Sequence, residues 1–141
     1  MSTKSVIIDA VRSPIGVKNG QLVGMRPDDL TAQVIKGLLA RNEKVKPEDI
    51  EDVVVGCAFP EGPQGMIIGR SAAVLAGIPK EAGGKVVNRF CGSAMDGLHQ
   101  MSTAIECGDI DVGIAAGVED MFSIPPGGFA PDFHPELAEH E

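Results

Sequence analysis

The sequence lacks tryptophan and tyrosine altogether, and it has little positive charge. Its 12 lysine and arginine residues are outnumbered by 20 aspartate and glutamate residues, which gives a formal net charge of −8 at pH 7. Nucleic-acid binding needs a basic surface, and single-strand binding also uses aromatic stacking platforms, so we expect no nucleic-acid partner. A small anionic ligand remains compatible, because a pocket can be locally positive in an acidic protein.

Cysteine is also sparse, and long apolar runs are absent from the sequence. The three cysteines, Cys57, Cys91 and Cys107, form no CxxC pair and no close cluster with histidine. This pattern predicts reduced thiols rather than a disulfide framework or a zinc site. No run approaches the roughly 18 apolar residues of a membrane span, and the first residues do not form an apolar signal region. We therefore expect a soluble, cytoplasmic protein with no membrane span.

The order of apolar runs and helical periodicities predicts an α/β fold. The 141 residues suit one domain, and the 43% hydrophobic content is enough for a packed core. Strands are predicted over residues 6–8, 53–55, 86–87 and 112–116, and helices over residues 28–42, 66–76 and 91–107. Gly77 and Gly108 are expected to end the last two helices. Alternation of this kind is typical of a mainly parallel sheet with helices on its faces. From Glu119 onward, four prolines predict irregular structure.

The segment with the clearest chemical content is Asn88-Arg89-Phe90-Cys91-Gly92-Ser93. It places Cys91 between a predicted strand and a predicted helix. The first N–H groups of a helix have no acceptor within the helix, and the positive end of the helix dipole lies there, so a thiolate is stabilised over a thiol. The thiolate is the nucleophilic form of cysteine, and the same N–H groups suit an oxyanion formed on a thioester. Cys91 is therefore a candidate nucleophile.

Spacing alone leaves a simpler interpretation open, since a lone cysteine is more often a small buried hydrophobe. Cys107 is predicted at a helix C-terminus, where the dipole disfavours a thiolate. Cys57 is predicted at the end of an apolar strand and is interpreted as structural. His99 is predicted on a helix face and His134 in an irregular segment, so neither is assigned as a base.

Taken in order, the motifs resemble those of the thiolase family over essentially the whole chain. Val86 to Ser93 is similar to the family's nucleophile motif, and Gly117-Val118-Glu119-Asp120-Met121 resembles the motif that closes its fourth strand. The resemblance implies a thiolase-like N-terminal half-domain with a mainly parallel, incomplete sheet and alternating helices. It also implies that residues 1–118 form a partial nucleophile domain and that residues 119–141 begin the loop domain.

Within the family, Asp132-Phe133-His134-Pro135 and the residues at Cys91 look most like the bacterial 3-ketoacyl-CoA thiolases (acetyl-CoA acyltransferases) of fatty-acid β-oxidation. This resemblance implies that Cys91 takes up the acyl group as a thioester while a 3-ketoacyl-CoA is cleaved by CoA. Coenzyme A is then a substrate, and neither a cofactor nor a metal is implied. The family also uses a histidine in a Gly-His-Pro motif and a cysteine in a Cys-x-Gly-Gly motif, and neither motif occurs in these residues.

The missing motifs imply that the isolated chain is inactive and needs a complementary C-terminal polypeptide. A fragment, a truncated gene and one half of a split enzyme all remain open at this point. One alternative is a non-catalytic truncated remnant or assembly subunit, and another is a ketosynthase-type condensing enzyme, which also loads an acyl chain onto a helix-start cysteine. The family resemblance further implies a homo-oligomer that pairs near residues 86–88 and a possible β-oxidation partner subunit.

Overall fold

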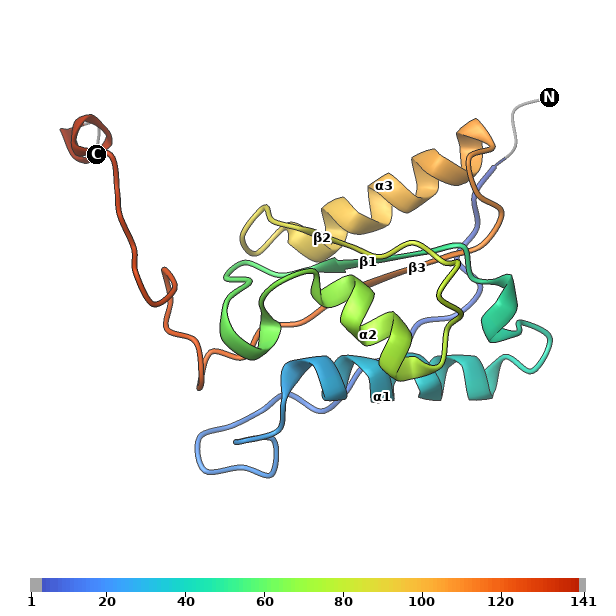
Figure 1. The fold of residues 1–141 in the computed structure, drawn as a ribbon, viewed down its shortest axis with the longest axis horizontal. Helices are drawn as coiled ribbons and strands as arrows, with labels where there is room; N and C mark the ends of the chain where they lie inside the picture. The colour runs from blue at the N-terminus through green and yellow to red at the C-terminus, as the bar shows by residue number, and fades with distance from the viewer. Residues whose placement is uncertain (1–3, 140–141) are drawn as a thin grey trace.

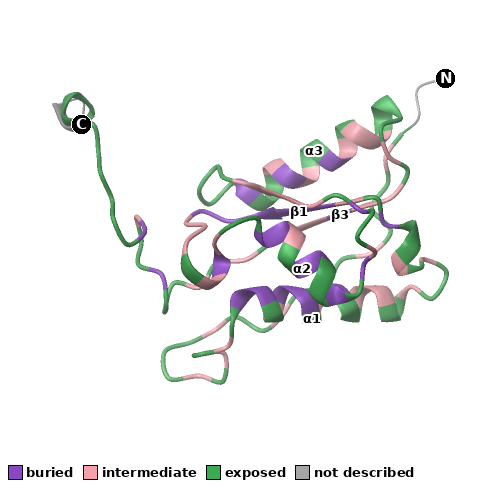
Figure 2. Ribbon diagram, in the orientation of Figure 1, coloured by how far each residue is buried: buried purple, intermediate pink, exposed green. Residues whose placement is uncertain are grey.

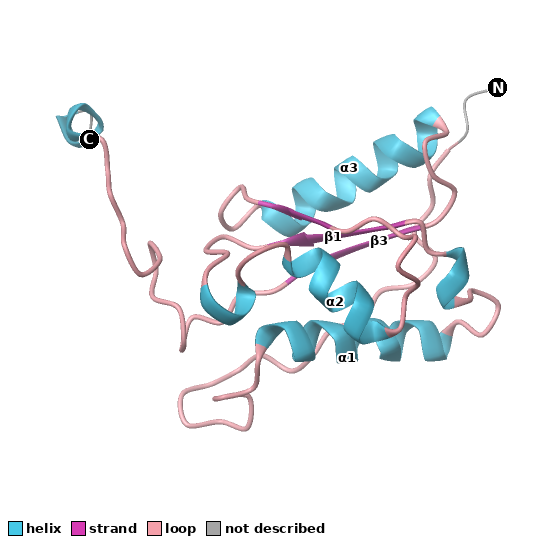
Figure 3. Cartoon of the chain, viewed as in Figure 1, coloured by secondary structure: helices cyan, strands magenta, loops and turns pink. Residues whose placement is uncertain are grey.

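The computed structural model describes residues 4–139 and contains three longer helices and one small sheet in that range. Helices and strands alternate along the chain from α1 to β3 (Figure 3). The elements are α1 (Pro27–Arg41), β1 (Asp52–Gly56), α2 (Ile68–Ala76), β2 (Lys85–Val87), α3 (Ser93–Cys107) and β3 (Gly113–Gly117). Short 3-10 helices lie at Pro47–Asp49, Gly62–Gln64 and Pro135–Glu139.

Among the described residues, the sheet has three strands in the order β2-β1-β3, and both pairs are parallel. Helix α3 lies on one face of this sheet, while α2 lies on the other face with α1 packed against it (Figure 1). The predicted α/β layers and parallel sheet are therefore confirmed. Because all three strands run the same way, their carboxyl ends meet at one edge, which is where ligands bind in open α/β sheets.

The central strand β1 forms the middle of the core. Val53, Val54 and Val55 are each 0% exposed, because helices cover both faces of this strand (Figure 2). Val53 and Val55 pack with Ile35 of α1 and with α2, whereas Val54 lies under Gly97 of α3. A strand buried on both faces needs a continuous apolar run rather than an alternating one, and this explains the Val-Val-Val sequence.

The strand predicted at residues 6–8 is wrong, so the described part of the chain has three strands rather than four. The segment is extended, but it forms no ladder with the sheet, and Val6, Ile7 and Ile8 are 77%, 70% and 66% exposed. Side chains on either side of it tie it to the helices: the Ser5 hydroxyl lies 2.6 Å from that of Ser102, and Asp9 accepts a hydrogen bond from the Asn42 amide. The apolar run specifies extended backbone, but a strand also requires a hydrogen-bonded neighbour.

Two helix starts also differ from the prediction, whereas the predicted helix ends are confirmed. Helices α2 and α3 each begin two residues later than expected. Met66, the first residue of the predicted second helix, has a φ of +56°, and a right-handed helix cannot include a residue in this left-handed conformation. Cys91 and Gly92 lie in a turn closed by hydrogen bonds to the carbonyls of Arg89 and Phe90, so α3 begins only at Ser93. Gly77 and Gly108 end the same helices with φ angles of +89° and +79°, which glycine adopts without strain.

The segment after β3 is irregular up to the 3-10 helix Pro135–Glu139, as the four prolines predict. In Figure 1 it leads away from the helices and the sheet. None of the helices within residues 4–139 is long and apolar enough to cross a membrane.

We expect the isolated chain to self-associate. Within the described residues, the outer edges of β2 and β3 pair with no further strand, and the apolar side chains of residues 6–8 are exposed. Open edges and apolar patches of this kind promote association. Light scattering at roughly tens of micromolar, where such surfaces associate, should show oligomers or aggregates. The double variant Val6→Lys/Ile8→Lys should shift the population toward monomer, whereas a clean wild-type monomer would contradict the expectation.

Candidate active site

Cys91 is exposed in the turn that joins β2 to α3. The turn is closed by two backbone hydrogen bonds: the Gly92 N–H donates to the Arg89 carbonyl at 3.0 Å, and the Ser93 N–H donates to the Phe90 carbonyl at 3.0 Å. Gly92 is the N-cap of α3, so Cys91 lies two residues before the first helical residue. The predicted position between strand and helix is confirmed, and its exposure rules out the alternative of a small buried hydrophobe.

The backbone of this turn is strained at one residue, and two side chains support it. Phe90 has a φ of +48°, a left-handed conformation that costs an ordinary residue about 1–2 kcal/mol. The Asn88 side-chain oxygen accepts a hydrogen bond from the Phe90 N–H at 3.0 Å. The buried Ser93 hydroxyl accepts the Arg89 N–H at 2.8 Å and donates to the Phe90 carbonyl at 2.6 Å. Hydrogen bonds of this kind contribute about 1 kcal/mol each, enough together to offset the strain.

Two glycines let the start of α3 approach the carboxyl edge of the sheet. A Cβ atom on Gly56, the last residue of β1, would clash with the backbone of Ser93 and Ala94. A Cβ atom on Gly117, the last residue of β3, would lie 2.7 Å from the Ala94 Cβ. The absence of side chains at these positions therefore brings the first turn of α3 directly onto the strand ends. As a result, Cys91 is presented at the edge where parallel strands end.

A polar cluster at the same edge was not predicted from the sequence. The Glu119 carboxylate accepts hydrogen bonds from the N–H groups of Ala58 and Phe59 at 2.7 and 3.3 Å and from the Gln64 amide at 2.7 Å. The Gln64 side chain is fully buried, donates to the Phe59 carbonyl at 2.7 Å and accepts the Asp120 N–H at 2.8 Å. The available sequence signal was a glutamate two residues past the end of a strand, within the motif that resembles the family's strand-closing motif.

The other two cysteines are placed as predicted. Cys57 is 1% exposed, and burial, together with the negative charge of Glu119, raises the pKa of its thiol to about 12. Its Sγ lies 3.7 Å from a Glu119 carboxylate oxygen, to which the thiol donates. Cys107 is the last residue of α3 and is exposed. His99 and His134 are exposed on α3 and in the C-terminal segment, respectively.

We expect iodoacetamide near neutral pH to label Cys91 first, Cys107 more slowly and Cys57 last. Cys91 is exposed in the turn at the start of α3, Cys107 is exposed at the other end of the same helix, and Cys57 is buried. Burial raises the pKa of the Cys57 thiol to about 12, so it stays protonated at neutral pH. Peptide mapping over time gives the three rates. Labelling of Cys91 at or below the rate of Cys107 would remove the basis for its assignment as nucleophile.

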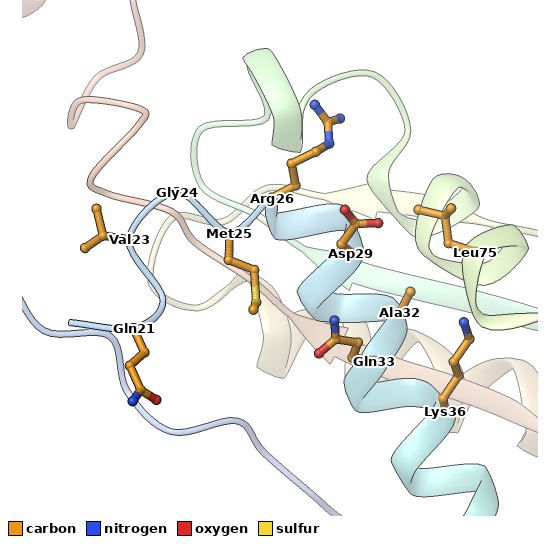
Figure 4. Close-up of a pocket in the computed structure, with 10 residues that line it drawn as sticks. All are labelled: Gln21, Val23, Gly24, Met25, Arg26, Asp29, Ala32, Gln33, Lys36 and Leu75. Atoms are coloured by element: carbon orange, nitrogen blue, oxygen red, sulfur yellow. The ribbon is translucent and has the colours of Figure 1, made fainter. Parts of the chain in front are cut away.

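One groove on the surface lies beside helix α1. It has a volume of about 550 Å³ and runs between the loop at Gly24 and Met25 and the helix α1, with Asp29 and Lys36 along one wall (Figure 4). Its lining comes from residues 21–36 and Leu75, and Cys91 is not among the lining residues. At its rim, the Arg26 guanidinium is already paired with Asp28 at 2.7 Å. We therefore assign no part of the active site to it.

A match to a protein-family model shows to which family the chain belongs. Residues 5–128 match the model described as the thiolase N-terminal domain. The chain belongs to the thiolase family. The matched residues include the Cys91 turn, the first turn of α3 and the polar cluster at Glu119, so the thiolase resemblance predicted from the sequence is confirmed.

Individual relatives support the same assignment. The chain is 45% identical over 135 residues to a 3-ketoacyl-CoA thiolase of Aeromonas hydrophila and 46% identical over 136 residues to one of Shewanella frigidimarina. These alignments cover 95% and 96% of this chain but 35% of each relative, so the chain spans about a third of their length. A crystal structure of the Bacillus anthracis acetyl-CoA acetyltransferase matches with a TM-score of 0.73 and 32% identity, covering 79% of this chain and 28% of that one. The thiolase-like α/β fold is thereby confirmed.

Proposed function

We propose that this chain carries the nucleophile of a 3-ketoacyl-CoA thiolase, with Cys91 as the residue that holds the acyl group. The observation that carries the proposal is the exposed Cys91 at the start of α3, within residues matched by the thiolase N-terminal domain. Relatives at 45–46% identity that are named 3-ketoacyl-CoA thiolase support the substrate class. Coenzyme A enters as a substrate, and no further cofactor is part of the proposal.

The proposed reaction has two halves. The Cys91 thiolate attacks the 3-keto carbonyl carbon, the bond between C2 and C3 breaks, and the electron pair leaves on C2 of acetyl-CoA, which takes up a proton. The shortened acyl group remains on Cys91 as a thioester. The deprotonated thiol of CoA then attacks this thioester carbonyl and releases the Cys91 thiolate with the shortened acyl-CoA. Cys91 at the start of α3 is thus the attacking group in the first half and the leaving group in the second.

Among the residues that the structure describes, we assign no group near Cys91 to the proton transfers. One group must take the proton of the attacking thiol, and another must protonate the departing C2 carbon. His99 and His134 are exposed on α3 and on the C-terminal segment, and we assign neither. We therefore propose that a complementary polypeptide carrying the Gly-His-Pro and Cys-x-Gly-Gly motifs completes the site.

The domain boundary is part of the same proposal. We assign residues 1–118 to a partial nucleophile domain and residues 119–141 to the start of the loop domain. The regular α/β elements end with β3 at Gly117, and the described chain after it is irregular up to residue 134, which supports the boundary.

We further propose that the protein is located in the cytoplasm, which its three cysteines free of disulfides support. A homo-oligomer and a β-oxidation partner subunit are proposed on the family resemblance alone.

Two alternatives lead to different observations. A ketosynthase-type enzyme would condense acyl groups rather than cleave a 3-ketoacyl-CoA, and the names of the relatives favour cleavage. A non-catalytic remnant or assembly subunit would transfer no acyl group in any combination. Reading the DNA that follows codon 141 shows whether the two missing motifs are encoded nearby. The functional test is the loss of 3-ketoacyl-CoA absorbance on addition of CoA, measured with the complementary polypeptide present.

A further inference from the structure

Glu119 joins two segments that end at the same edge of the sheet. It follows β3 by two residues, and its carboxylate holds the N–H groups of Ala58 and Phe59, which follow β1. The buried Gln64 amide binds the same carboxylate and also the Phe59 carbonyl, so the loop over residues 57–64 is fastened at both ends. Hydrogen bonds to an ionised acceptor are the stronger kind, and here one carboxylate supports the whole loop.

We propose that Glu119 is a positioning residue for Cys91, acting through the loop that it holds and through Asn88. This inference rests on the proposed function. It assigns no contact between Glu119 and the substrate, and the reacting atom remains the Cys91 sulfur.

The path from Glu119 to the Cys91 turn is a continuous series of contacts. Ala58, whose N–H binds Glu119, accepts at its carbonyl a 2.7 Å hydrogen bond from the Asn88 amide. The other end of the Asn88 side chain accepts the N–H of the left-handed Phe90 at 3.0 Å. The rings of Phe59 and Phe90 also lie against each other with centroids 6.0 Å apart. Phe90 directly precedes Cys91, so the place of the loop determines the conformation that presents the thiol.

Loss of the Glu119 carboxylate should therefore change the reactivity of the Cys91 thiol. Glutamine at position 119 has one acceptor oxygen, so its NH₂ group would face either the Ala58 N–H, which now binds Oε2, or the Phe59 N–H and the Gln64 amide, which now bind Oε1. The loop would shift, and Asn88 would lose its fixed acceptor. Phe90 would then relax toward an ordinary negative φ, and Cys91 would leave its place at the start of α3. The thiol would react more like an ordinary exposed cysteine.

The chain offers a matched control at the opposite end of the same strands. The Glu51 carboxylate, just before β1, accepts the N–H groups of Asp111 and Val112, the latter at 3.1 Å, just before β3. Glu51 and Glu119 are both exposed residues that bridge the β1 and β3 segments, but Glu51 does so at the amino ends, away from Cys91. Glu51→Gln therefore makes the same chemical change away from Cys91, at a carboxylate whose two hydrogen bonds both go to one oxygen.

The test compares the iodoacetamide labelling rate of Cys91 with that of Cys107 in the same chain. We expect Glu119→Gln to lower the ratio of Cys91 to Cys107 labelling by about tenfold, which corresponds to about 1.4 kcal/mol, and to increase labelling of Cys57. Glu51→Gln should leave the ratio unchanged. Asn88→Ala, which breaks the path one step nearer to Cys91, should lower the ratio while Cys57 stays protected. A merely structural role of Glu119 would lower the melting temperature of Glu119→Gln but not this ratio.

The labelling ratios of the variants support or overturn the positioning role of Glu119. An unchanged ratio in folded Glu119→Gln overturns the proposal, and so does an equal fall in Glu51→Gln. If Glu119→Gln does not fold, so that all three cysteines react alike, Asn88→Ala decides: a lowered ratio supports the path and an unchanged ratio overturns it. If Cys91 of the wild-type chain labels no faster than Cys107, the proposed function itself is contradicted. If Cys91 labels faster than Cys107 but its rate is the same in Glu119→Gln, only the positioning role of Glu119 is contradicted.

Discussion

The Cys91→Ser variant should lose thiolysis when it is combined with the polypeptide that completes the site. A serine hydroxyl is almost fully protonated at neutral pH, and the start of a helix stabilises an alkoxide far too little to ionise it. We expect the turnover number to fall by about 10³-fold or more, as is typical when a covalent nucleophile is removed. The measurement is the decay of 3-ketoacyl-CoA absorbance after CoA is added, with binding of the two polypeptides checked separately.

Cys107→Ser is the matched control, because it makes the same substitution in another exposed cysteine at the far end of the same helix. It should leave turnover unchanged. Mass spectrometry of the wild-type chain after exposure to a 3-ketoacyl-CoA without CoA should show the acyl group on the peptide that contains Cys91. Full activity in Cys91→Ser, or acylation of Cys107 instead, would contradict the assignment of the nucleophile.

Much of the fold follows from local sequence because the decisive signals are local. The Val53–Val55 run predicts a strand covered on both faces, and β1 is the central strand with a helix layer on each side. Gly77 and Gly108 predict helix ends, and both adopt the left-handed conformation that ends α2 and α3. Residues 6–8 show where local reasoning stops, since their sequence is as strand-like as that of β1. Whether such a run becomes a strand depends on a neighbour that its own sequence does not specify.

In the candidate site too, local sequence identifies some residues, whereas others are placed only by contacts formed in the folded chain. Cys91 could be singled out because its residue type and its place before a helix both carry chemistry. The left-handed Phe90 could not, because phenylalanine has no preference for that conformation, and Asn88 and Ser93 hold it through contacts formed in the folded turn. Glu119 is distant from Ala58 in sequence, and only the meeting of β1 and β3 ends brings them together. Polar clusters built from separate strand ends carry little sequence signal.

The isolated 141-residue chain should not cleave acetoacetyl-CoA or a longer 3-ketoacyl-CoA. Thiolysis requires one group to accept the proton of the attacking thiol and another to protonate the C2 carbon that leaves. General acid–base steps contribute about 10²–10⁴-fold each, so the loss of both places turnover below detection even when Cys91 is ionised. The chain also spans only about a third of the length of the 3-ketoacyl-CoA thiolases that it resembles.

Addition of a polypeptide that carries the complementary part, including the Gly-His-Pro and Cys-x-Gly-Gly motifs, should restore cleavage. The control is the same polypeptide with the histidine of its Gly-His-Pro motif changed to alanine, which should bind the chain but leave turnover at background. Robust turnover by the isolated chain would overturn the proposed division of roles, since one of its own side chains, such as one of its three histidines, would then have to act as the base. Failure of the complemented pair, with the two polypeptides shown to bind and Cys91 shown to be reactive, would favour the non-catalytic assembly subunit. The two results are separated by the same absorbance assay, because the first shows activity without a partner and the second shows none with it.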